Sequence, residues 1–369
     1  GNVFCGERTL RRVDASAPMP SVLEIGDAAL SECTHLEWVS LSGLSNVTTV
    51  GDGVLCNNAR LRAISMAGMT RLQRIGHDFA SECAQLVSVE FPVEAPELTD
   101  IGRDFLAETP SLRSVDTAGL TALTTVPASW FHRSGVDTCP VPGGDVRQIV
   151  GTFCSGCHSL QHANLTRLGN AVAIGDSFLG GCSSLRDIDL STLRSLETIG
   201  PYALHRCTSL TSVRGFTELR RVARIHDNLL SCAVALQEVS LSGMNALKRI
   251  GRSCFAECRV LRSVRVSNLA NLEVIEDRFC AACVALTLAD LSGLPALKSI
   301  GLCFFFGCHQ LASLDLSGAA VAAMPWRAPF KRANPTATSP PVTTVVHLAG
   351  ASAELCAVFE AASFVEVRL

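Results

Sequence analysis

The sequence predicts a repeat solenoid of the α/β class, in which stacked turns each contribute a short strand to a parallel β-sheet. Two observations predict it. A 25-residue unit recurs, so that the stretches beginning at Leu236, Leu261 and Leu286 are close copies of one another. Each unit also carries leucine, phenylalanine and cysteine at fixed offsets, and a single unit is too thin to bury them unless neighbours stack on it.

The repeat covers most of the 369 residues. When the first leucine of L-x-x-[VIL]-x-L is used as the phase mark, successive units are 24, 25 or 26 residues long. A degenerate stretch in the middle contains prolines and a Gly-Gly pair but keeps the phase through Val136, Cys139 and Val141, so no domain boundary is expected there. The phase marks are Leu10, Leu36, Leu61, Leu86, Leu112, Val136, Leu160, Leu185, Leu210, Leu236, Leu261, Leu286 and Leu311.

Each part of the unit predicts a local structure. The L-x-x-V-x-L segment alternates apolar and polar residues, as a half-buried strand does. The following Ser-Gly predicts a turn in which glycine takes a positive φ. The second segment, L-x-x-I-G, returns along the far side and ends at another glycine. The remaining xxFxxxC is long enough for one or two turns of helix with Phe and Cys on its inward face, so short helical or irregular segments are expected on the outer side.

The chain is expected to be a single repeat domain spanning residues 1–369. The repeats occupy about residues 10–324, a Pro-rich loop follows at about 325–342, and two atypical capping units occupy 343–369. A cap is expected because the last turn otherwise exposes its apolar face. At the other end "NVFCGERT" resembles the back half of a unit, which predicts either a short cap or a natural chain that extends further N-terminally.

The pattern L-x-x-V-x-L…L-x-x-I-G-x-x-F-x-x-x-C resembles the BspA type of leucine-rich repeat. The wording "LSGL" and "IGDSFL" is similar to leucine-rich repeat proteins of kinetoplastid protists. The resemblance spans about Leu10 to Leu316. It implies a curved, right-handed solenoid with the parallel β-sheet on its concave face. It also implies an interaction surface, because the family has no common reaction.

Composition narrows the class of partner. Hydrophobic residues make up 48% of the chain and charged residues 18%, which is ample material for a core. The net charge of -3 gives no electrostatic reason to expect a nucleic acid. No apolar run reaches the roughly 18 residues that a membrane-spanning helix needs, and the N-terminal residues do not resemble a signal peptide. A protein is therefore the expected partner.

Many of the 17 cysteines recur at one position, three residues before the next phase leucine, which we call the cysteine slot. A buried cysteine acts as a small hydrophobe whose S–H can donate to a backbone carbonyl. A column of buried thiols favours a reducing compartment such as the cytoplasm, although a secreted or surface location stays open. The slot residues of this type are Cys33, Cys83, Cys157, Cys182, Cys207, Cys258, Cys283 and Cys308.

The sequence predicts no metal, cofactor, small-molecule substrate or catalytic activity. The C-x-x-C pairs Cys154/Cys157 and Cys280/Cys283 lie five units apart, about 24 Å at the spacing of neighbouring strands, so they cannot share the four ligands of one zinc ion. The chain contains no phosphate-binding loop, no G-x-S-x-G motif and no H-E-x-x-H motif.

The third and fifth residues of each first strand are expected to point outward and to form the partner-binding face. Trp38 is a large aromatic residue in the third position, which makes it a candidate hot spot; packing against an N-terminal cap is an equal alternative. His162 occupies the same column. Charged residues that could give specificity follow, although an ordinary solvated surface is the alternative for them. They are Asp187, Asp189, Arg214, Glu238 and Arg265.

Basic residues also recur on the second-strand side of the units, where an aligned ridge could bind an acidic protein or RNA. Acidic residues at Asp100, Glu197 and Glu273 interrupt this ridge. Its members are Arg74, Arg103, Arg147, Arg224, Lys248, Arg249 and Arg252.

Taken together, these features favour a non-catalytic protein-protein interaction scaffold that binds a protein partner or occupies a place in a larger assembly. One alternative is a secreted or surface adhesion module that contacts a host. A second alternative is a substrate-recruiting accessory subunit of an enzyme complex.

Overall fold

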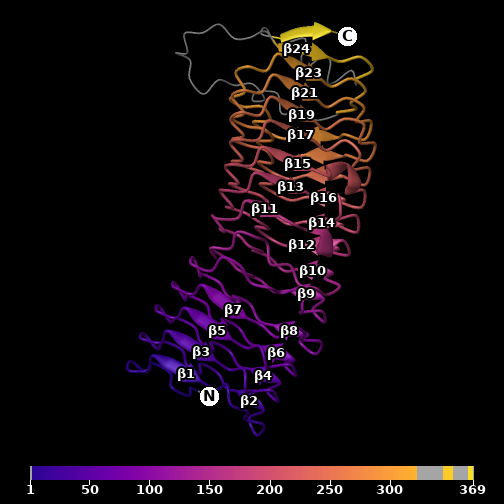
Figure 1. The fold of residues 1–369 in the computed structure, drawn as a ribbon. Coiled ribbons are helices and arrows are strands. Elements are labelled where there is room, and N and C mark those ends of the chain that lie inside the picture. The colour runs from indigo at the N-terminus through magenta and orange to yellow at the C-terminus, as the bar shows by residue number, and fades with distance from the viewer. Residues whose placement is uncertain (1, 322–343, 352–364, 369) are drawn as a thin grey trace. The chain divides into compact units, whose positions relative to one another are not determined.

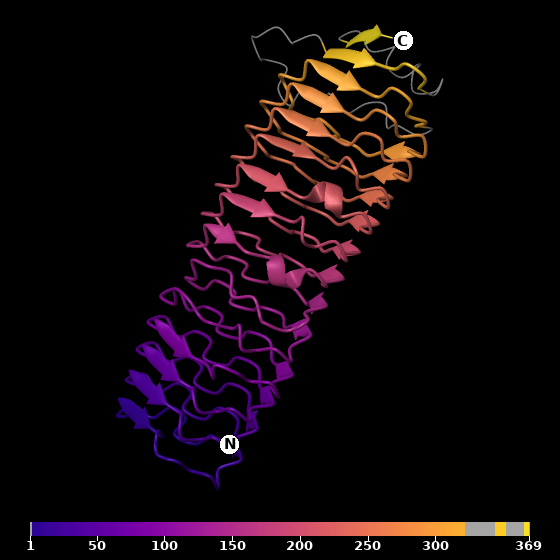
Figure 2. The same cartoon turned by 45° about the vertical axis from the view of Figure 1, so that its right-hand side comes forward.

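The computed structural model describes residues 2–321, 344–351 and 365–368, in two compact units, residues 1–183 and 184–369. Each unit is a parallel β-solenoid, and the chain makes about 12 turns with almost no helix. Every regular turn places one strand on a first side and a shorter strand on the opposite side (Figures 1 and 2). The organisation of the chain as a single domain stays a prediction.

The first unit contains two four-stranded parallel sheets, one on each side. Equivalent residues align from turn to turn, as in Arg12↔Trp38 and Trp38↔Ala63. The first-side strands are β1 (Arg12–Asp14), β3 (Trp38–Ser40), β5 (Ala63–Ser65), β7 (Ser88–Glu90) and β11 (His162–Ala163). The second-side strands are β2 (Glu24–Ile25), β4 (Thr49–Val50), β6 (Arg74–Ile75), β8 (Asp100–Ile101), β9 (Thr125–Val126), β10 (Gln148–Ile149) and β12 (Ala173–Ile174). A short 3₁₀ helix, η1, spans Thr166–Leu168.

The second unit repeats this arrangement. Its first-side strands are β13 (Asp187–Asp189), β15 (Ser212–Arg214), β17 (Glu238–Ser240), β19 (Ser263–Arg265), β21 (Leu288–Asp290), β23 (Ser313–Asp315), β24 (Thr344–His347) and β25 (Val365–Arg368). Its second-side strands are β14 (Thr198–Ile199), β16 (Arg224–Ile225), β18 (Arg249–Ile250), β20 (Val274–Ile275) and β22 (Ser299–Ile300). The 3₁₀ helix η2 spans Phe216–Glu218. Strands β24 and β25 extend the sheet in parallel, at the place where capping units are expected. The Pro-rich loop expected at about 325–342 lies outside the described residues.

The middle of the repeat keeps its phase but loses regular strand. Val136 and Val141 are buried as expected, while Cys139 is only half-buried. The first-side segment there makes one isolated bridge, Thr138↔His162. Proline lacks the N–H that a strand donates to its neighbour, and "CPVP" supplies two prolines within this segment. The prolines therefore explain why the alternating pattern predicts strand where the chain forms none.

The prediction of a helix in the xxFxxxC segment is wrong. Overlapping four-residue turns replace it; in one repeat the N–H of Ala281 donates to Arg278 O (3.1 Å) and that of Cys283 to Cys280 O (3.4 Å). The third residue of each such turn is left-handed, as in a type II turn, with φ of 52° at Cys280 and 60° at Ala282. Paired strands on both sides keep neighbouring turns about 4.8 Å apart, whereas a helix is about 10 Å in diameter, so a helix in every turn does not fit.

We call the side of each turn that carries the xxFxxxC segment the turn side. Its left-handed residues let the backbone form hydrogen bonds with both neighbouring turns. The N–H of Arg278 (φ 61°) donates to Leu302 O of the next turn (2.7 Å), and that of Cys280 donates to Cys254 O of the preceding turn (3.0 Å). The N–H of Ala282 again reaches the next turn, at Phe306 O. Backbone hydrogen bonds thus continue between turns on the side that has no strand, which satisfies groups that burial would otherwise leave unpaired.

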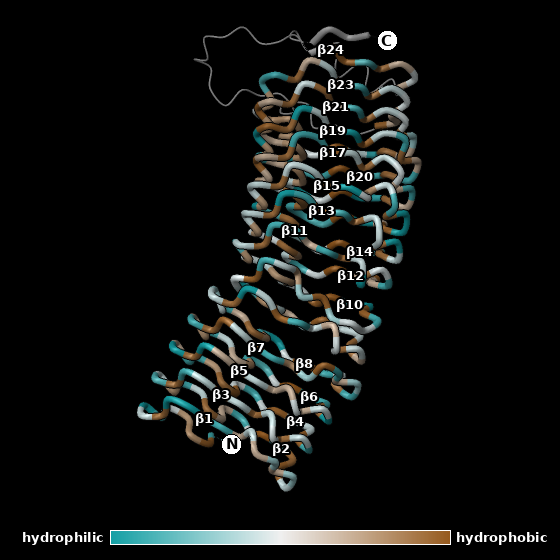
Figure 3. Tube along the Cα trace, in the orientation of Figure 1, coloured by the Kyte–Doolittle hydropathy of each residue, from teal (hydrophilic) through white to brown (hydrophobic). Residues whose placement is uncertain are grey.

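The core is a stack of similar apolar layers, and brown apolar positions recur at the same place in successive turns (Figure 3). Leucines of the phase mark such as Leu36 and Leu261 are fully buried. Phenylalanines at the fixed offset lie over one another, with ring centroids 5.3 Å apart for Phe153 and Phe178. The phenylalanine that recurs at this offset therefore stacks on its equivalent in the neighbouring turn, as its regular spacing predicts.

Most cysteine-slot side chains bridge neighbouring turns. The thiol of Cys83 donates to Leu55 O (3.2 Å) and that of Cys258 to Leu230 O (3.2 Å), both in the preceding turn. Asn58 occupies the same slot, and its amide donates to Leu30 O at 2.8 Å. The donor role expected for the slot is therefore present, and it explains why Asn substitutes for Cys there.

Glycine is needed at the turn after the first-side strand for two different reasons. At Gly243 and Gly293 the φ is positive, as expected for the Ser-Gly turn. At Gly43 and Gly68 the φ is not positive, so the expectation is wrong there. An added Cβ would overlap the carbonyl oxygen of a residue in the preceding turn, Ala17 at Gly43 and Ser42 at Gly68. Clearance between turns, rather than backbone conformation, selects glycine at these two positions.

Candidate functional site

In the first unit, the outward face of the first-side strands is built around Trp38. Its side chain is half-buried in β3, and the Arg12 guanidinium of β1 lies 3.9 Å from the ring centroid. The aligned residue on the other side is Ala63. A cation-π contact of this kind holds the indole in place. Arg12 stands in the outward column of the sequence, but only the structure assigns it this role.

Arg12 is itself held by a neighbour. Its guanidinium lies 3.6 Å from Asp14 Oδ2. The hydroxyl and the N–H of Ser16 donate to the Asp14 carboxylate, which lowers its pKa and keeps it charged. Asp14, Arg12 and Trp38 therefore form a connected surface group.

His162 lies in β11, where its side chain is exposed and its backbone bridges Thr138. The structure places it in the outward column as expected. Its role in binding stays a prediction.

In the second unit, three of the expected charged residues are close together. Arg214 of β15 aligns with Asp189 of β13, and its guanidinium lies 4.0 Å from Asp187 Oδ1. Asp189 also has a local role, because it accepts the N–H of Ser191 at 2.8 Å. Hydrogen bonds from the hydroxyl and N–H of Ser191 lower the pKa of Asp189. One oxygen of this carboxylate is therefore committed to the turn.

The remaining two charged candidates are exposed on neighbouring strands. Glu238 of β17 aligns with Ser263, and Arg265 of β19 aligns with Ser240 on one side and Asp290 on the other. Both charged side chains are exposed beside a serine, and Arg265 also has the carboxylate-bearing Asp290 as a neighbour. The five charged residues thus share one face of the second unit, as the columns predict.

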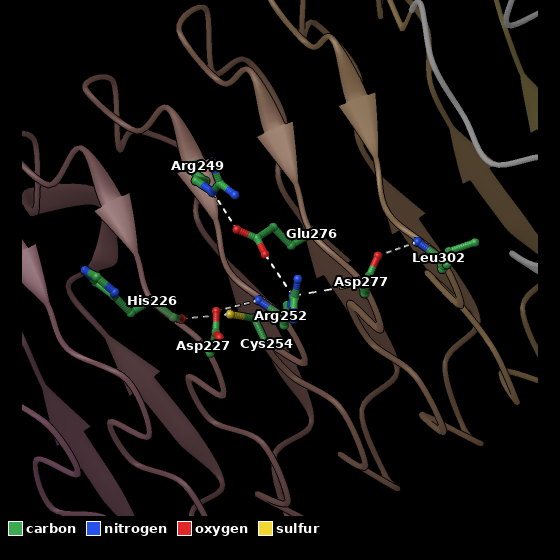
Figure 4. A network of polar contacts seen from close by, with 8 residues as sticks. All are labelled: His226, Asp227, Arg249, Arg252, Cys254, Glu276, Asp277 and Leu302. Carbon is green, nitrogen blue, oxygen red and sulfur yellow. Dashed lines mark hydrogen bonds and ion pairs between the residues drawn. The ribbon is translucent and has the colours of Figure 1, made fainter.

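The second-strand side carries charged networks that the sequence columns do not reveal. Glu276 accepts hydrogen bonds from Arg249 and, at 3.2 Å, from Arg252, and it keeps only 13% of its side chain exposed (Figure 4). Arg252 also lies 4.0 Å from Asp277 (Figure 4). These ion pairs connect neighbouring turns through their side chains.

Aspartates two residues after the buried Ile or Val of the second-side strand form a further set of bridges that sequence reasoning missed. Oδ1 of Asp227 accepts the N–H of Arg252 (2.9 Å), and Oδ1 of Asp277 accepts the N–H of Leu302 (2.8 Å) (Figure 4). In the first unit Asp52 accepts the N–H of His77 in the same way (2.9 Å). The available signal was the aspartate that recurs two residues after the Ile or Val of the second-side strand.

The buried thiols are chemically quiet. Burial raises the pKa of Cys83 to about 12, and it raises that of Cys254 to about 12. Burial also raises the pKa of Cys154 and Cys280, the first members of the two C-x-x-C pairs. A thiol is reactive only as its thiolate, so these side chains are poorly suited to redox chemistry or metal binding.

In residues 2–321, 344–351 and 365–368, no cluster of three or more His, Cys, Asp or Glu side chains is arranged to hold a metal ion. Within the same ranges, no helix combines the length and apolar character needed to span a bilayer.

Comparison with known proteins identifies the repeat. The family model described as "BspA type Leucine rich repeat region (6 copies)" matches residues 2–136, 124–241 and 223–322. No curated protein matches the chain significantly. The expected similarity to kinetoplastid proteins stays a prediction.

Solved structures share the fold at low sequence identity. A leucine-rich repeat protein from Bacteroides ovatus matches with a TM-score of 0.56 and 18% identity over 92% of this chain and 76% of that one. A leucine-rich cell surface protein from Faecalibacterium prausnitzii matches with a TM-score of 0.41 and 14% identity over 77% and 88% of the chains. The pneumococcal vaccine antigen PcpA matches with a TM-score of 0.38 and 14% identity over 99% and 90%.

Proposed function

Because this chain belongs to the family of BspA-type leucine-rich repeat proteins, we propose that it is a non-catalytic scaffold that binds a protein partner on the outward face of its first-side strands. Solenoids present extended faces of this kind to their partners. The right-handed, concave form of that face is part of the proposal. No cofactor or small-molecule substrate takes part.

The observation that carries the proposal is the position of Trp38. It is the one Trp, Tyr or Phe in the two outward columns. Arg12 stacks on its ring, so little side-chain entropy is lost when a partner covers it. Tryptophan and arginine are also the residues most often found as hot spots in protein interfaces. The pair therefore supports a protein as the ligand, and the alternative in which Trp38 packs only against an N-terminal cap is the rival that experiment must exclude.

The test begins with capture of partners from native cells and their identification by mass spectrometry. The affinity of the purified partner is then measured for Trp38→Ala and for Tyr202→Ala, which removes an exposed aromatic residue from the turn side. We expect Trp38→Ala to weaken binding at least tenfold and Tyr202→Ala to leave it unchanged. Equal affinity of the two variants would contradict the proposal.

Charge reversal tests the second unit separately. Combined Asp189→Arg and Arg214→Asp substitutions keep the net charge but invert the pattern on β13 and β15. If this part of the face takes part in binding, the partner's affinity falls. An unchanged affinity removes Asp187, Asp189 and Arg214 from the proposed site.

A surface-exposed adhesion module is the second candidate. The cytoplasmic location rests on thiols that need a reducing compartment, whereas most of the described cysteines are buried, and burial together with a raised pKa, as at Cys83, protects a thiol from oxidation. Surface labelling of intact native cells distinguishes the two locations. A substrate-recruiting subunit is a third candidate, which copurification with a catalytic protein would support.

A further inference from the structure

The basic residues of the second-strand side behave differently in the two units. In the first unit each is neutralised by a neighbour: Arg74 lies 3.3 Å from Asp100, Arg103 lies 3.6 Å from Asp104, and Arg147 lies 3.1 Å from Asp145. The ridge expected from the sequence is therefore cancelled there. Whatever anion-binding capacity this side has belongs to the second unit.

In the second unit five exposed basic residues form what we call the basic patch. Among the described residues only its Arg249 has a carboxylate within 4.0 Å, that of Glu276. Lys248 lies near Glu273, but the carboxylate of Glu273 is hydrogen-bonded to Lys298. The members of the patch are Arg220, Arg221, Arg224, Lys248 and Arg249.

Strand register brings these like charges together. Arg224 of β16 aligns directly with Arg249 of β18, which separates their backbones by about 4.8 Å. The N–H of Lys248 donates to Ala223 O at 2.8 Å, so Lys248 lies beside the same strand. Like charges opposite one another on neighbouring strands destabilise a sheet. An anionic partner relieves this repulsion.

The size and the surroundings of the patch define the partner. Its two neighbouring turns, with the arginines before β16, span about 10 Å, the length of about three residues of extended chain at 3.3 Å each. Glu197 lies on the preceding turn, and the carboxylates of Glu273 and Glu276 on the following turn are paired with Lys298 and with Arg249 and Arg252. A short run of carboxylates fits between these limits.

Charge over the whole chain also disfavours a nucleic acid. Residues 1–183 contain 19 Asp and Glu against 12 Lys and Arg, and residues 184–369 contain 15 against 19, giving formal charges of −7 and +4. The isoelectric point of the chain is about 6.3, whereas nucleic-acid-binding domains commonly exceed 9. We propose that the basic patch docks a short acidic segment of a protein partner, independently of the first-side face.

The test uses fluorescence anisotropy with a labelled hexaglutamate peptide, its hexaglutamine counterpart and a six-nucleotide single-stranded DNA. The patch variant combines Arg221→Ser and Arg224→Ser. The matched control combines Arg103→Ser and Arg147→Ser, which removes the same charge from arginines paired in the first unit. Thermal unfolding of both variants verifies that each remains folded.

We expect hexaglutamate to bind at 50 mM salt, to bind at least tenfold more weakly at 300 mM salt because ions screen the contact, and to lose at least tenfold affinity in the patch variant. The control variant should change affinity less than twofold, and hexaglutamine should not bind. Failure of hexaglutamate to bind, or an equal loss in both variants, would overturn the proposal. Tighter binding of the DNA than of hexaglutamate would replace the acidic protein segment with a nucleic acid.

Discussion

The strand side and the turn side of one repeat bury similar side chains but hold them with different backbones. On the strand side Val264 is fully buried between parallel strands of ordinary extended conformation. On the turn side Leu230 and Phe255 are equally buried, yet their φ angles are 56° and 61°. The strand side needs only apolar alternation, whereas the turn side also needs clearance at glycines and donors at the cysteine slot. Substitutions on the turn side should therefore expose requirements that the strand side lacks.

The largest effect is expected from Gly251→Ala, at the entry to the turn side. The added Cβ lies 2.5 Å from Asp227 Oδ1, 2.6 Å from His226 C and 2.7 Å from Asp227 N. Backbone atoms of a stacked turn cannot move aside, so we expect a loss of about 3 kcal/mol in the free energy of unfolding, at the upper end of overpacking effects. Urea denaturation at 25 °C measures it.

Gly181→Ala is the matched control for Gly251→Ala. Gly181 has a φ of 74° and its nearest atom to an added Cβ is 3.5 Å away. Only the left-handed backbone then opposes alanine, at a cost of about 1 kcal/mol. A loss at Gly251 no larger than at Gly181 would show that clearance between turns is not the requirement.

The next effect separates the S–H donor of the cysteine slot from its packing. Cys258 is buried and donates to Leu230 O. Cys258→Val fills the space but leaves that carbonyl with the N–H of Ala233 (3.1 Å) as its remaining donor, so the lost hydrogen bond costs about 1 kcal/mol. Cys258→Thr keeps a donor, as Thr109 does in its own slot with a bond to Leu106 O (2.8 Å). We expect the threonine variant to be the more stable of the two, by thermal and urea unfolding.

Val264 provides the contrast on the strand side. There the residue makes only apolar contacts, so threonine should be less stable than valine because its hydroxyl is buried without a partner. The order of stability should therefore reverse between positions 258 and 264. The same order at both positions would refute a donor role for the slot thiol.

The same comparison shows how far the sequence predicts the fold. Periodicity places Leu36, Leu261 and their equivalents in the core because a repeated apolar position has to face the neighbouring turn. It does not distinguish a helix from overlapping turns, since both bring Phe and Cys to one face. The available signal was glycine at Gly156, Gly181 and Gly307, where the φ is positive and other repeats place Glu, Arg or Ala.

The candidate sites also contain features that the sequence predicts and features that it does not. The outward position of Trp38 follows from its place in the strand, so the sequence identifies it. Ion pairing does not follow, because it depends on which residue the next turn places beside each charge. Thus Arg74 forms an ion pair with Asp100 of the next turn, whereas Arg224 is aligned with Arg249. Spacing fixes the columns of the repeat, but the contacts between columns require the register.

The smallest effect concerns pH on the turn side, where His132 and His205 occupy the position that Ser81 fills in another repeat. Among the described residues, the Nδ1 atoms of both histidines are buried without a hydrogen-bond partner. Burial, reinforced by the adjacent Arg133 and Arg206, lowers the pKa of the two imidazoles.

The sign of the pH effect follows from that lowering. Above the ordinary histidine pKa, near 6.5, the two imidazoles are neutral in the folded and in the unfolded chain, and the full stability is present. Below it, the unfolded chain binds protons that the folded imidazoles do not, so the free energy of unfolding falls as the pH decreases. Combined His132→Ser and His205→Ser should flatten the fall measured by urea unfolding between pH 7 and 5, whereas His309→Ser, at an exposed histidine, should not. Parallel pH profiles for both variants would place the acid sensitivity outside the turn side.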